Sequence, residues 1–233
     1  MEAWARVMSA CFRSAAKALD EGGLPLLLLR LLQKLCAPVG EFGSVIFLSR
    51  ELDQELPEPG SAPSLTLREA SPIDIRYLLG ASHPSRLTEV LLERFRCGDF
   101  CFVAIDADGM VVHSCWATTR PAEIPELARM VILTPEEVYL YDAYTRPDLR
   151  QRGIFSLILS FSLRCLRAAG FKRAYLYVRA DNPLSLRAVK RWLRPVARVW
   201  FLRLDSLRPL VLGWRRLRLP QLAKGIAHDG RGS

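Results

Sequence analysis

The sequence predicts an α/β fold in which helices flank a mixed β-sheet. Three observations support this prediction. Half of the 233 residues are apolar, which is enough for a substantial core. The apolar pattern changes repeatedly between the two-residue period of strands and the longer period of helices. An Asp-Gly turn between two apolar runs predicts a β-hairpin.

Residues 1–55 are predicted to form a helical N-terminal extension, with two helical patterns followed by a short strand at Ser44–Leu48. The run Leu24–Leu29 is strongly apolar, but Arg30 and Lys34 interrupt it, so it is too short to span a bilayer. It also lacks the basic segment and the cleavage site of a signal peptide, so we expect a cytoplasmic protein. We favour packing of the extension on the main domain as a lid; a dimer contact and contact with a membrane surface are the alternatives.

Residues 56–64, LPEPGSAPS, are predicted to be a linker because they are rich in proline, glycine and serine. Beyond them, Ser64–Arg68 alternates like a strand. Helical patterns then cover Ile73–Leu79 and Ser85–Arg96.

The hairpin predicted next has strands at Phe100–Ile105 and Met110–Ala117, and residues 120–135 show no clear pattern. The following elements are a strand at Val138–Thr145, a helix over Gly153–Ala169 that ends at Gly170, a strand at Arg173–Val178, a helix opened by Asn182–Pro183, and strands at Val196–Leu204 and Leu210–Trp214. Residues 206–233 are predicted to be this last strand and a basic tail, with contact to anionic lipid or RNA as the alternative.

Charge is unevenly distributed along the chain. Residues 1–145 carry 13 basic and 20 acidic side chains, whereas residues 146–203 carry 14 basic and 2 acidic ones. The second segment therefore has a net charge of +12 and favours a polyanionic partner, although a solvated basic face would have the same composition.

Cysteine and histidine spacing supports no zinc site and no disulfide framework. The six cysteines form no CxxC pair, and the three histidines are scattered at His83, His113 and His228. We expect the cysteines to be small buried side chains in a reducing compartment, and we expect no metal.

The junction between the strand ending at Thr145 and the helix after Gly153 has the features of an anion site. The first N–H groups of a helix have no partner within the helix, and a glycine allows an anion to approach them. Arg150 and Arg152 can add charge-assisted hydrogen bonds. Neither the Walker pattern GxxxxGK[ST] nor the dinucleotide pattern GxGxxG is present.

The run Thr145–Ile154, TRPDLRQRGI, follows a predicted strand and opens a predicted helix. It resembles motif A of the GNAT N-acyltransferase superfamily, usually written V-x-P-x-x-[RQ]-x-x-G-x-[GA]. Asn182–Arg187 resembles the Asn-x-x-[AS] segment of the same family. The predicted order of elements from Ser64 to Leu204 also fits, so the resemblance covers roughly 60% of the chain.

This resemblance implies a GNAT-like, mostly antiparallel sheet in an acyltransferase domain over residues 65–205. It also implies acetyl-CoA as co-substrate, with its pantetheine alongside the strand that ends at Thr145 and its phosphates in the basic segment. The residues implied to bind the cofactor are Tyr144, Thr145, Arg150, Gln151, Arg152, Gly153, Ile154, Phe155, Asn182 and Ser185. Two positions depart from the family: Phe155 replaces a small residue, and Val189 stands where many relatives carry a general-acid tyrosine.

Acyl transfer to an amine requires a free-base amine, a stabilised oxyanion and a protonated leaving thiolate. Asp142 is the first candidate base, His113 the second, and Tyr144 is among the tyrosines that could protonate the thiolate. Each also has a structural interpretation: Asp142 bonded to backbone or to an arginine, His113 buried in a strand, and Tyr144 in a wall of the cleft. Strand alternation places Tyr139 and Tyr141 on one face and Asp142 and Tyr144 on the other, unless a bulge resets it.

We therefore predict an N-acyltransferase that moves an acetyl group from acetyl-CoA to a primary amine of a small molecule or amino sugar. The alternatives are a long-chain N-acyltransferase, or a non-catalytic acyl-CoA-binding or RNA-binding protein on the same scaffold. A homodimer is a further alternative, and a membrane surface and nucleic acid are less favoured partners.

Overall fold

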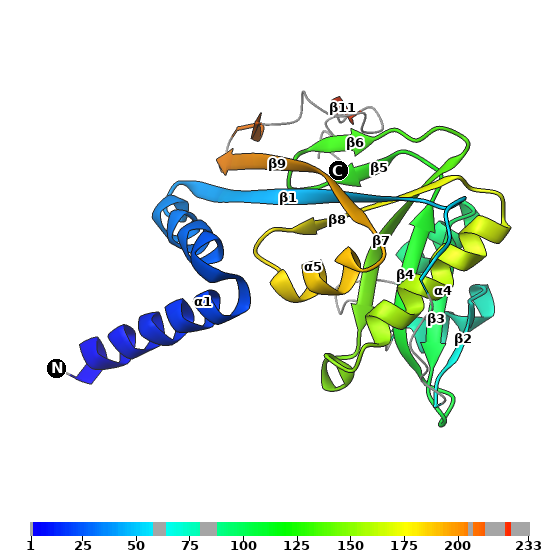
Figure 1. Cartoon of the computed structure of the whole chain (residues 1–233), viewed down its shortest axis with the longest axis horizontal. Helices are drawn as coiled ribbons and strands as arrows, with labels where there is room; N and C mark the ends of the chain where they lie inside the picture. The colour runs from blue at the N-terminus through cyan, green and yellow to red at the C-terminus, as the bar shows by residue number, and fades with distance from the viewer. Residues whose placement is uncertain (1, 58–63, 80–87, 205–206, 213–221, 225–233) are drawn as a thin grey trace, which may run out of the picture.

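The computed structural model describes residues 2–57, 64–79, 88–204, 207–212 and 222–224, with side chains from Ala18 onward except in 222–224. Its centre is an eight-stranded sheet in the order β10-β9-β1-β8-β7-β4-β3-β2 (Figure 1). In that order the strands are Leu210–Leu212, Arg194–Leu204, Gly40–Glu51, Arg173–Arg179, Glu137–Thr145, Val111–Thr118, Phe100–Ile105 and Thr66–Glu69. All neighbouring pairs are antiparallel except β7 and β8, so the predicted mixed, mostly antiparallel sheet is confirmed.

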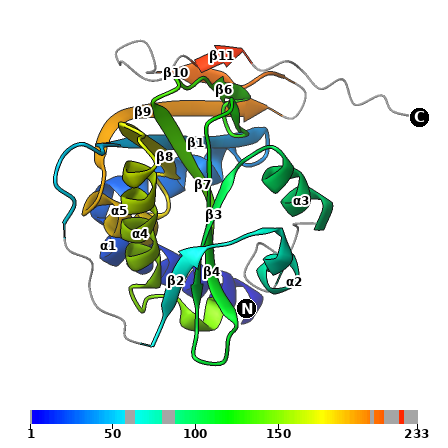
Figure 2. The ribbon, with the colours of Figure 1, turned by 90° about the vertical axis from the view of Figure 1, so that its right-hand side faces the viewer.

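Helices cover both faces of this sheet, as Figure 2 shows in a view along it. On one face, α4 (Ile154–Ala168) packs on β3, β4 and β7, and α5 (Pro183–Lys190) lies beside it. On the other face lie the 3₁₀ turn Pro72–Asp74, α2 (Ile75–Leu78) and α3 (Thr88–Arg96). The main core forms between α4 and the sheet, because the buried face of α4 presents Ile158, Leu159 and Leu163 at helical spacing.

A small second sheet lies over one end of the molecule. Its strands are β5 (Ala122–Ile124), β6 (Arg129–Val131) and β11 (Leu222–Lys224), in the order β11-β6-β5. The sequence pattern of residues 120–135 did not predict β5 and β6, because strands of three residues are too short to show a period.

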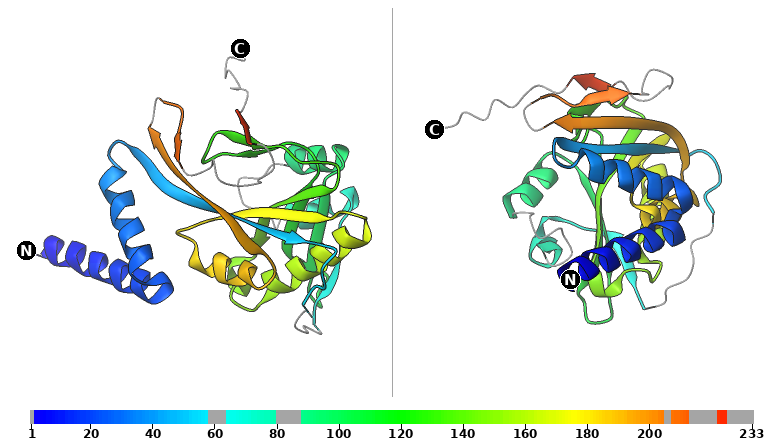
Figure 3. Two further views of the ribbon diagram at one scale, coloured as in Figure 1. Left: turned by 45° about the horizontal axis from the view of Figure 1, so that its top comes forward. Right: turned by 90° about the vertical axis from the view of Figure 1, so that its left-hand side faces the viewer.

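The N-terminal helix α1 (Glu2–Cys36) consists of two helical stretches separated at Gly23, which has a φ of 67°. The first stretch extends away from the sheet, and the second lies beside β1 and β9 (Figure 3). Leu26 and Leu29 are buried there against Phe42 and Trp200. The opposite side of the second stretch exposes Leu24, Leu28, Leu31, Leu32 and Leu35.

The strand predicted at Ser44–Leu48 is a twelve-residue strand, β1, in the middle of the sheet. It pairs antiparallel with β8 on one edge and with β9 on the other. Val45, Phe47 and Leu48 are buried because both faces of β1 are covered. Residues 40–51 are therefore part of the central sheet. Most of the predicted linker, residues 58–63, lies outside the described residues.

The remaining predictions near the site agree closely with the structure. The predicted hairpin is β3 and β4, and Gly109 in its turn has a φ of 76°. The predicted helix after Gly153 is α4, followed by Gly170 with a φ of 92°. Asn182 caps α5, and Pro183 is its first residue.

Candidate active site

The site begins where β7 and β8 separate. These parallel strands pair only from Glu137 opposite Arg173 to Tyr139 opposite Tyr175. Beyond Tyr139 the described chain supplies no strand on this edge of β7, so its main-chain N–H and C=O groups face the space between the two strands.

A cleft of about 1170 Å³ occupies this space. Its lining includes Phe155 and Leu159 from the α4 face of the sheet, and Tyr139 and Tyr177 from the opposite face. The cleft therefore passes between the separated strands and connects the two faces. Among the predicted site residues, Arg152 alone is not part of the lining; those that line it are His113, Asp142, Tyr144, Thr145, Arg150, Gln151, Gly153, Ile154, Phe155, Asn182 and Ser185.

Gly153 shapes one wall of this cleft. Its φ of 78° is in the left-handed region, which other residues adopt at a cost, and a Cβ added there would meet no atom within 4 Å. The Gly153 carbonyl accepts the hydrogen bond of Leu157 at 3.1 Å. The N–H groups of Ile154, Phe155 and Ser156 thus precede the first hydrogen bond of α4 and are positioned for an anion.

The three arginines of the loop differ in their partners. Arg146 is paired with Asp148 at 2.7 Å and lies 3.9 Å from Asp106. Arg150 donates from Nε to the Thr145 carbonyl at 3.2 Å, and its guanidinium lies 5.6 Å from the Tyr144 ring centre. Arg152 is exposed, and neither it nor Arg150 forms an ion pair with a described carboxylate. Two cationic groups of the loop are therefore available to an anion, one of them inside the cleft.

Asn182 and Ser185 form the start of α5 on the same wall. The Asn182 side-chain oxygen accepts a hydrogen bond from the Ser185 N–H at 3.1 Å, so its structural role is that of an N-cap. Leu184 and Ala188 continue the wall with apolar surface.

A β-bulge in β7 determines the position of Asp142. Ser114 pairs with Tyr144 and Trp116 with Tyr141, so that Asp142 and Ala143 lie opposite one residue of β4. Asp142 has a φ of 47°, which non-glycine residues rarely adopt.

The bulge brings Tyr141 and Asp142, adjacent in sequence, to the same side chain of α3. The Arg94 guanidinium donates to Asp142 Oδ2 at 2.7 Å and lies 4.8 Å from the Tyr141 ring centre. The bulge therefore resets the strand alternation that would otherwise separate these two residues, which is the exception included in the sequence prediction. Asp142 is bonded to an arginine, as its structural interpretation predicts. Its role as a base stays a prediction.

His113 is a buried neutral side chain. It is 1% exposed, its Nδ1 lies 2.7 Å from Thr145 Oγ1, and its ring stacks on Phe155 with a centroid distance of 5.8 Å. Burial lowers the pKa of His113 to about 3. Its Nε2 atom is buried and has no hydrogen-bond partner among the residues that the structure describes. A base of such low pKa is poorly matched to an amine at neutral pH, and the catalytic role of His113 stays a prediction.

The two departures from the family motif have structural roles. Phe155 packs at the edge of the main core and supports His113. Val189 is fully buried in that core and does not line the cleft. Beside it, Trp192 donates from Nε1 to the Ser156 hydroxyl at 2.7 Å, which connects the end of α5 to the first turn of α4.

The polar residues on the face of the cleft opposite to α4 were not among the site residues predicted from the sequence. Asp99 accepts from the Tyr141 hydroxyl at 2.7 Å and pairs with Arg120 at 3.0 Å. Glu126, in the turn between β5 and β6, accepts from the Tyr177 hydroxyl at 2.8 Å. No motif marks these residues, because they come together only through the sheet and the short β5–β6 hairpin.

Comparisons with known proteins agree with this geometry. The acetyltransferase (GNAT) family matches residues 70–193. A GCN5-related N-acetyltransferase from Kribbella flavida has 14% identity and a TM-score of 0.53, covering 80% of this chain and 65% of its own. Another from Sphaerobacter thermophilus has 19% identity and a TM-score of 0.51, covering 75% and 54%. The chain thus spans about half to two thirds of these structures, and no curated protein matches it.

The strand separation, the loop at Gly153 and the matched span define an acyltransferase fold of the GNAT type. This chain belongs to the GNAT family of acetyltransferases. None of the helices in the described ranges has a stretch both long and apolar enough to cross a membrane.

Proposed function

We propose that the protein transfers an acetyl group from acetyl-CoA to the primary amine of a small molecule. The observation that carries this proposal is the cleft between β7 and β8, which has the start of α4 on one side and continues to the other face of the sheet. A donor held on the α4 side would leave the opposite side to the acceptor, so the two substrates would meet between the strands.

The residues present fit the donor. The N–H groups at the start of α4, the open space above Gly153 and the cations of Arg150 and Arg152 suit a pyrophosphate. Leu176 and Val178 on β8 and Leu184 on α5 supply an apolar wall for a pantetheine chain. The unpaired edge of β7 offers main-chain groups for hydrogen bonds to its amides.

The reaction requires the amine nitrogen to attack the thioester carbon, forming a C–N bond and breaking the C–S bond. The carbonyl oxygen becomes an oxyanion in between, and N–H groups of β7 near Tyr144 and Thr145 are the proposed donors to it. Asp142 is proposed as the base, with His113 as the second candidate, and Tyr144 is proposed as the proton donor to the thiolate. The bond between Asp142 and Arg94 keeps that carboxylate inside the cleft wall.

Thermal unfolding with acetyl-CoA, followed by thiol release with a panel of amines, tests this proposal. A ligand that binds the folded state alone raises the melting temperature with concentration. We expect acetyl-CoA to do so and free thiol to appear only when a suitable amine is present. If acetyl-CoA produces no shift, the proposed donor site is wrong.

The same assays separate the alternatives. A long-chain acyl-CoA that outperforms acetyl-CoA would identify a long-chain acyltransferase, and stabilisation without transfer to any amine would identify an acyl-CoA-binding protein. RNA binding with steep salt dependence, together with no response to acyl-CoA, would identify a nucleic-acid-binding protein. A cytoplasmic location is also proposed, and the burial of Cys101 and Cys115 as small apolar side chains supports it.

A further inference from the structure

The wall of the cleft opposite to α4 contains three tyrosine rings. The Tyr139 and Tyr141 rings have centroids 6.2 Å apart and planes 2° apart. On the neighbouring strand, the Tyr177 ring lies 6.5 Å from Tyr139 with planes 10° apart. All three line the cleft, although Tyr139 is only 3% exposed, so they form an aromatic floor of nearly parallel rings that fits a flat apolar group.

Carboxylates border this floor, and two of them have a close arginine of their own. Asp142 pairs with Arg94 at 2.7 Å, and Asp99 pairs with Arg120 at 3.0 Å. Each of these charges is balanced by a cation at hydrogen-bond distance, so neither demands a positively charged ligand.

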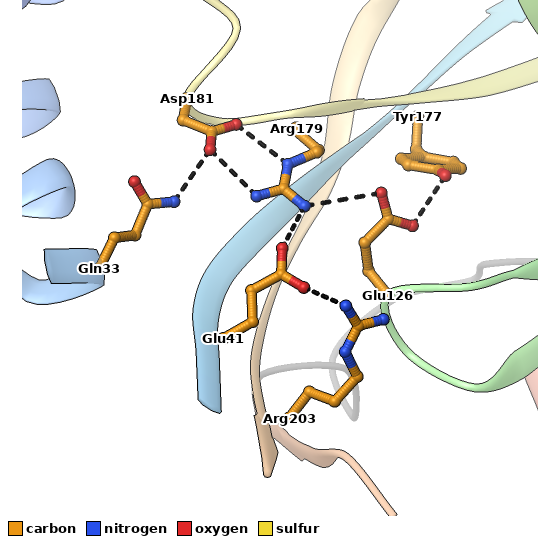
Figure 4. A network of polar contacts seen from close by, with 7 residues as sticks. All are labelled: Gln33, Glu41, Glu126, Tyr177, Arg179, Asp181 and Arg203. Atoms are coloured by element: carbon orange, nitrogen blue, oxygen red, sulfur yellow. Dashed lines mark hydrogen bonds and ion pairs between the residues drawn. The ribbon is translucent and has the colours of Figure 1, made fainter. Parts of the chain in front are cut away.

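Glu126 differs, because its arginine is shared. Arg179 pairs with Glu41 at 2.6 Å and with Asp181 at 3.0 Å, whereas its closest atom lies 4.0 Å from Glu126 (Figure 4). Burial raises the pKa of Tyr177, so its hydroxyl stays protonated and donates to Glu126.

The network in Figure 4 carries an excess negative charge. Its carboxylates are Glu41, Glu126 and Asp181, and its cations are Arg179 and Arg203, with Arg203 bound to Glu41. Three negative charges against two positive ones leave a net charge of −1, and Glu126 is the member with the longest ion pair. Its side chain is 15% exposed and lines the cleft, where a carboxylate in partial burial attracts a cation.

We propose that Glu126 binds the ammonium group of the acceptor, while Tyr139, Tyr141 and Tyr177 contact a flat apolar part of the same molecule. The acceptor class is therefore an arylalkylamine with a single positive charge and no carboxylate. This subsite rests on the proposed function for its role in catalysis, but its binding can be measured separately. Tyr177 and Arg179 hold the Glu126 side chain, and Gln33 of α1 donates to Asp181 at 2.9 Å at the other end of the network.

Isothermal titration of three probes against the full chain with coenzyme A present tests the acceptor class. The probes are phenethylamine, phenylalanine, which adds a carboxylate, and glucosamine, which lacks the flat apolar group. We expect phenethylamine to bind at least about tenfold more tightly than either, because the excess charge repels a carboxylate and the floor disfavours a polyol. Equal or tighter binding of phenylalanine or glucosamine, or no binding of phenethylamine, would overturn the proposal.

Replacement of the carboxylate tests Glu126 itself. Glu126→Gln keeps the shape and an acceptor for Tyr177, and we expect it to weaken phenethylamine binding about tenfold or more while coenzyme A affinity changes less than about twofold. The matched control is Glu136→Gln, because Glu136 is 58% exposed, pairs with Lys172 and lies outside the cleft. Unchanged amine binding by Glu126→Gln overturns the subsite.

The two proposals can fail separately. Binding of phenethylamine that depends on Glu126, without acetyl transfer, would support the subsite and contradict the proposed function. Transfer from acetyl-CoA to amines, with a KM for the amine that Glu126→Gln leaves unchanged, would support the proposed function and contradict the subsite. In an active enzyme, the variant should raise the KM for phenethylamine and leave the KM for acetyl-CoA near its original value.

Discussion

Gly153 has two properties whose effects can be distinguished by comparing substitutions at two glycines. It has a left-handed backbone, and it leaves open space at the start of α4. We predict that Gly153→Leu abolishes thermal stabilisation by acetyl-CoA, because a side chain would occupy the space in front of the helix N–H groups. Gly170→Leu is the matched control, since Gly170 also has a positive φ and open surroundings but follows the far end of α4.

Both variants should lose stability in the absence of ligand by roughly 1–2 kcal/mol, the cost of a left-handed residue with a side chain. If the two variants lose similar stability but differ in thermal stabilisation by acetyl-CoA, that difference isolates the effect on the site. Full stabilisation of Gly153→Leu by acetyl-CoA would contradict the placement of the pyrophosphate at this loop.

Asp142 can be tested for a structural role through its partner. Its side chain is 16% exposed and that of Arg94 is 10% exposed, so Asp142→Asn leaves a largely buried cation without its close carboxylate. We predict a loss of about 3 kcal/mol in the free energy of unfolding. In a double-mutant cycle, Arg94→Gln together with Asp142→Asn should recover part of this loss, as measured by denaturant unfolding.

Activity in the same cycle separates the structural role from a catalytic one. If Asp142 acts only through Arg94, the double variant recovers activity along with stability. If Asp142 is the base, both Asp142→Asn and the double variant stay inactive, although the double variant recovers stability.

His113 should make the protein sensitive to acid. Its pKa of about 3 in the folded protein lies below the value of 6.5 in the unfolded chain, so the unfolded chain takes up the proton first. The contribution of His113 to stability is therefore complete above pH 6.5 and decreases as the pH falls towards 3. Between pH 6.5 and pH 5 the loss is on the order of 2 kcal/mol.

Unfolding of the wild type and of His113→Leu at pH 7 and pH 5 measures this contribution. The variant cannot titrate at this position, so its stability should change less between the two pH values than that of the wild type. Equal changes in both proteins would show that burial does not keep His113 neutral.

At the scale of elements, local signals predicted those parts of the site that depend on local chemistry. Asp-Gly between apolar runs marks a turn that needs a positive φ, and Asn182 before Pro183 marks a helix start. Gly153, which has a φ of 78°, likewise marks the turn into α4 at the proposed anion site. In each case the residues that carry the signal are neighbours in the sequence.

Two features of the site escaped prediction because they depend on pairing between strands. The bulge at Asp142 is set by the register between β4 and β7, and the segment YLYDAYT has the alternation of an ordinary strand. Glu126 reaches the cleft only because the short strands β5 and β6 fold over β7 and β8. The aromatic floor likewise joins residues of two strands whose partnership the sequence does not specify.

At the scale of the whole molecule, the N-terminal segment contributes a central strand. The sequence pattern indicated a strand near residues 44–48 but not its neighbours, because period and composition do not identify pairing partners. The family match begins at residue 70, so β1 lies outside the matched span even though it joins β8 to β9. The domain boundary at residue 65 thus stays a prediction, and chain truncation can test it.

We predict that a chain starting at residue 56 does not fold, whereas one starting at residue 24 does. The shorter chain lacks β1, so β8 and β9 lose a shared partner, and the two cores lose the buried side chains of Val45, Phe47 and Leu48. The longer chain keeps β1 and the packing of Leu26 and Leu29 on it, and its melting temperature should fall by no more than about 5 °C. Circular dichroism during heating should show a cooperative transition for the longer chain and none for the shorter one. A cooperative transition of residues 56–233 would contradict the prediction, because it would mean that the sheet forms without β1.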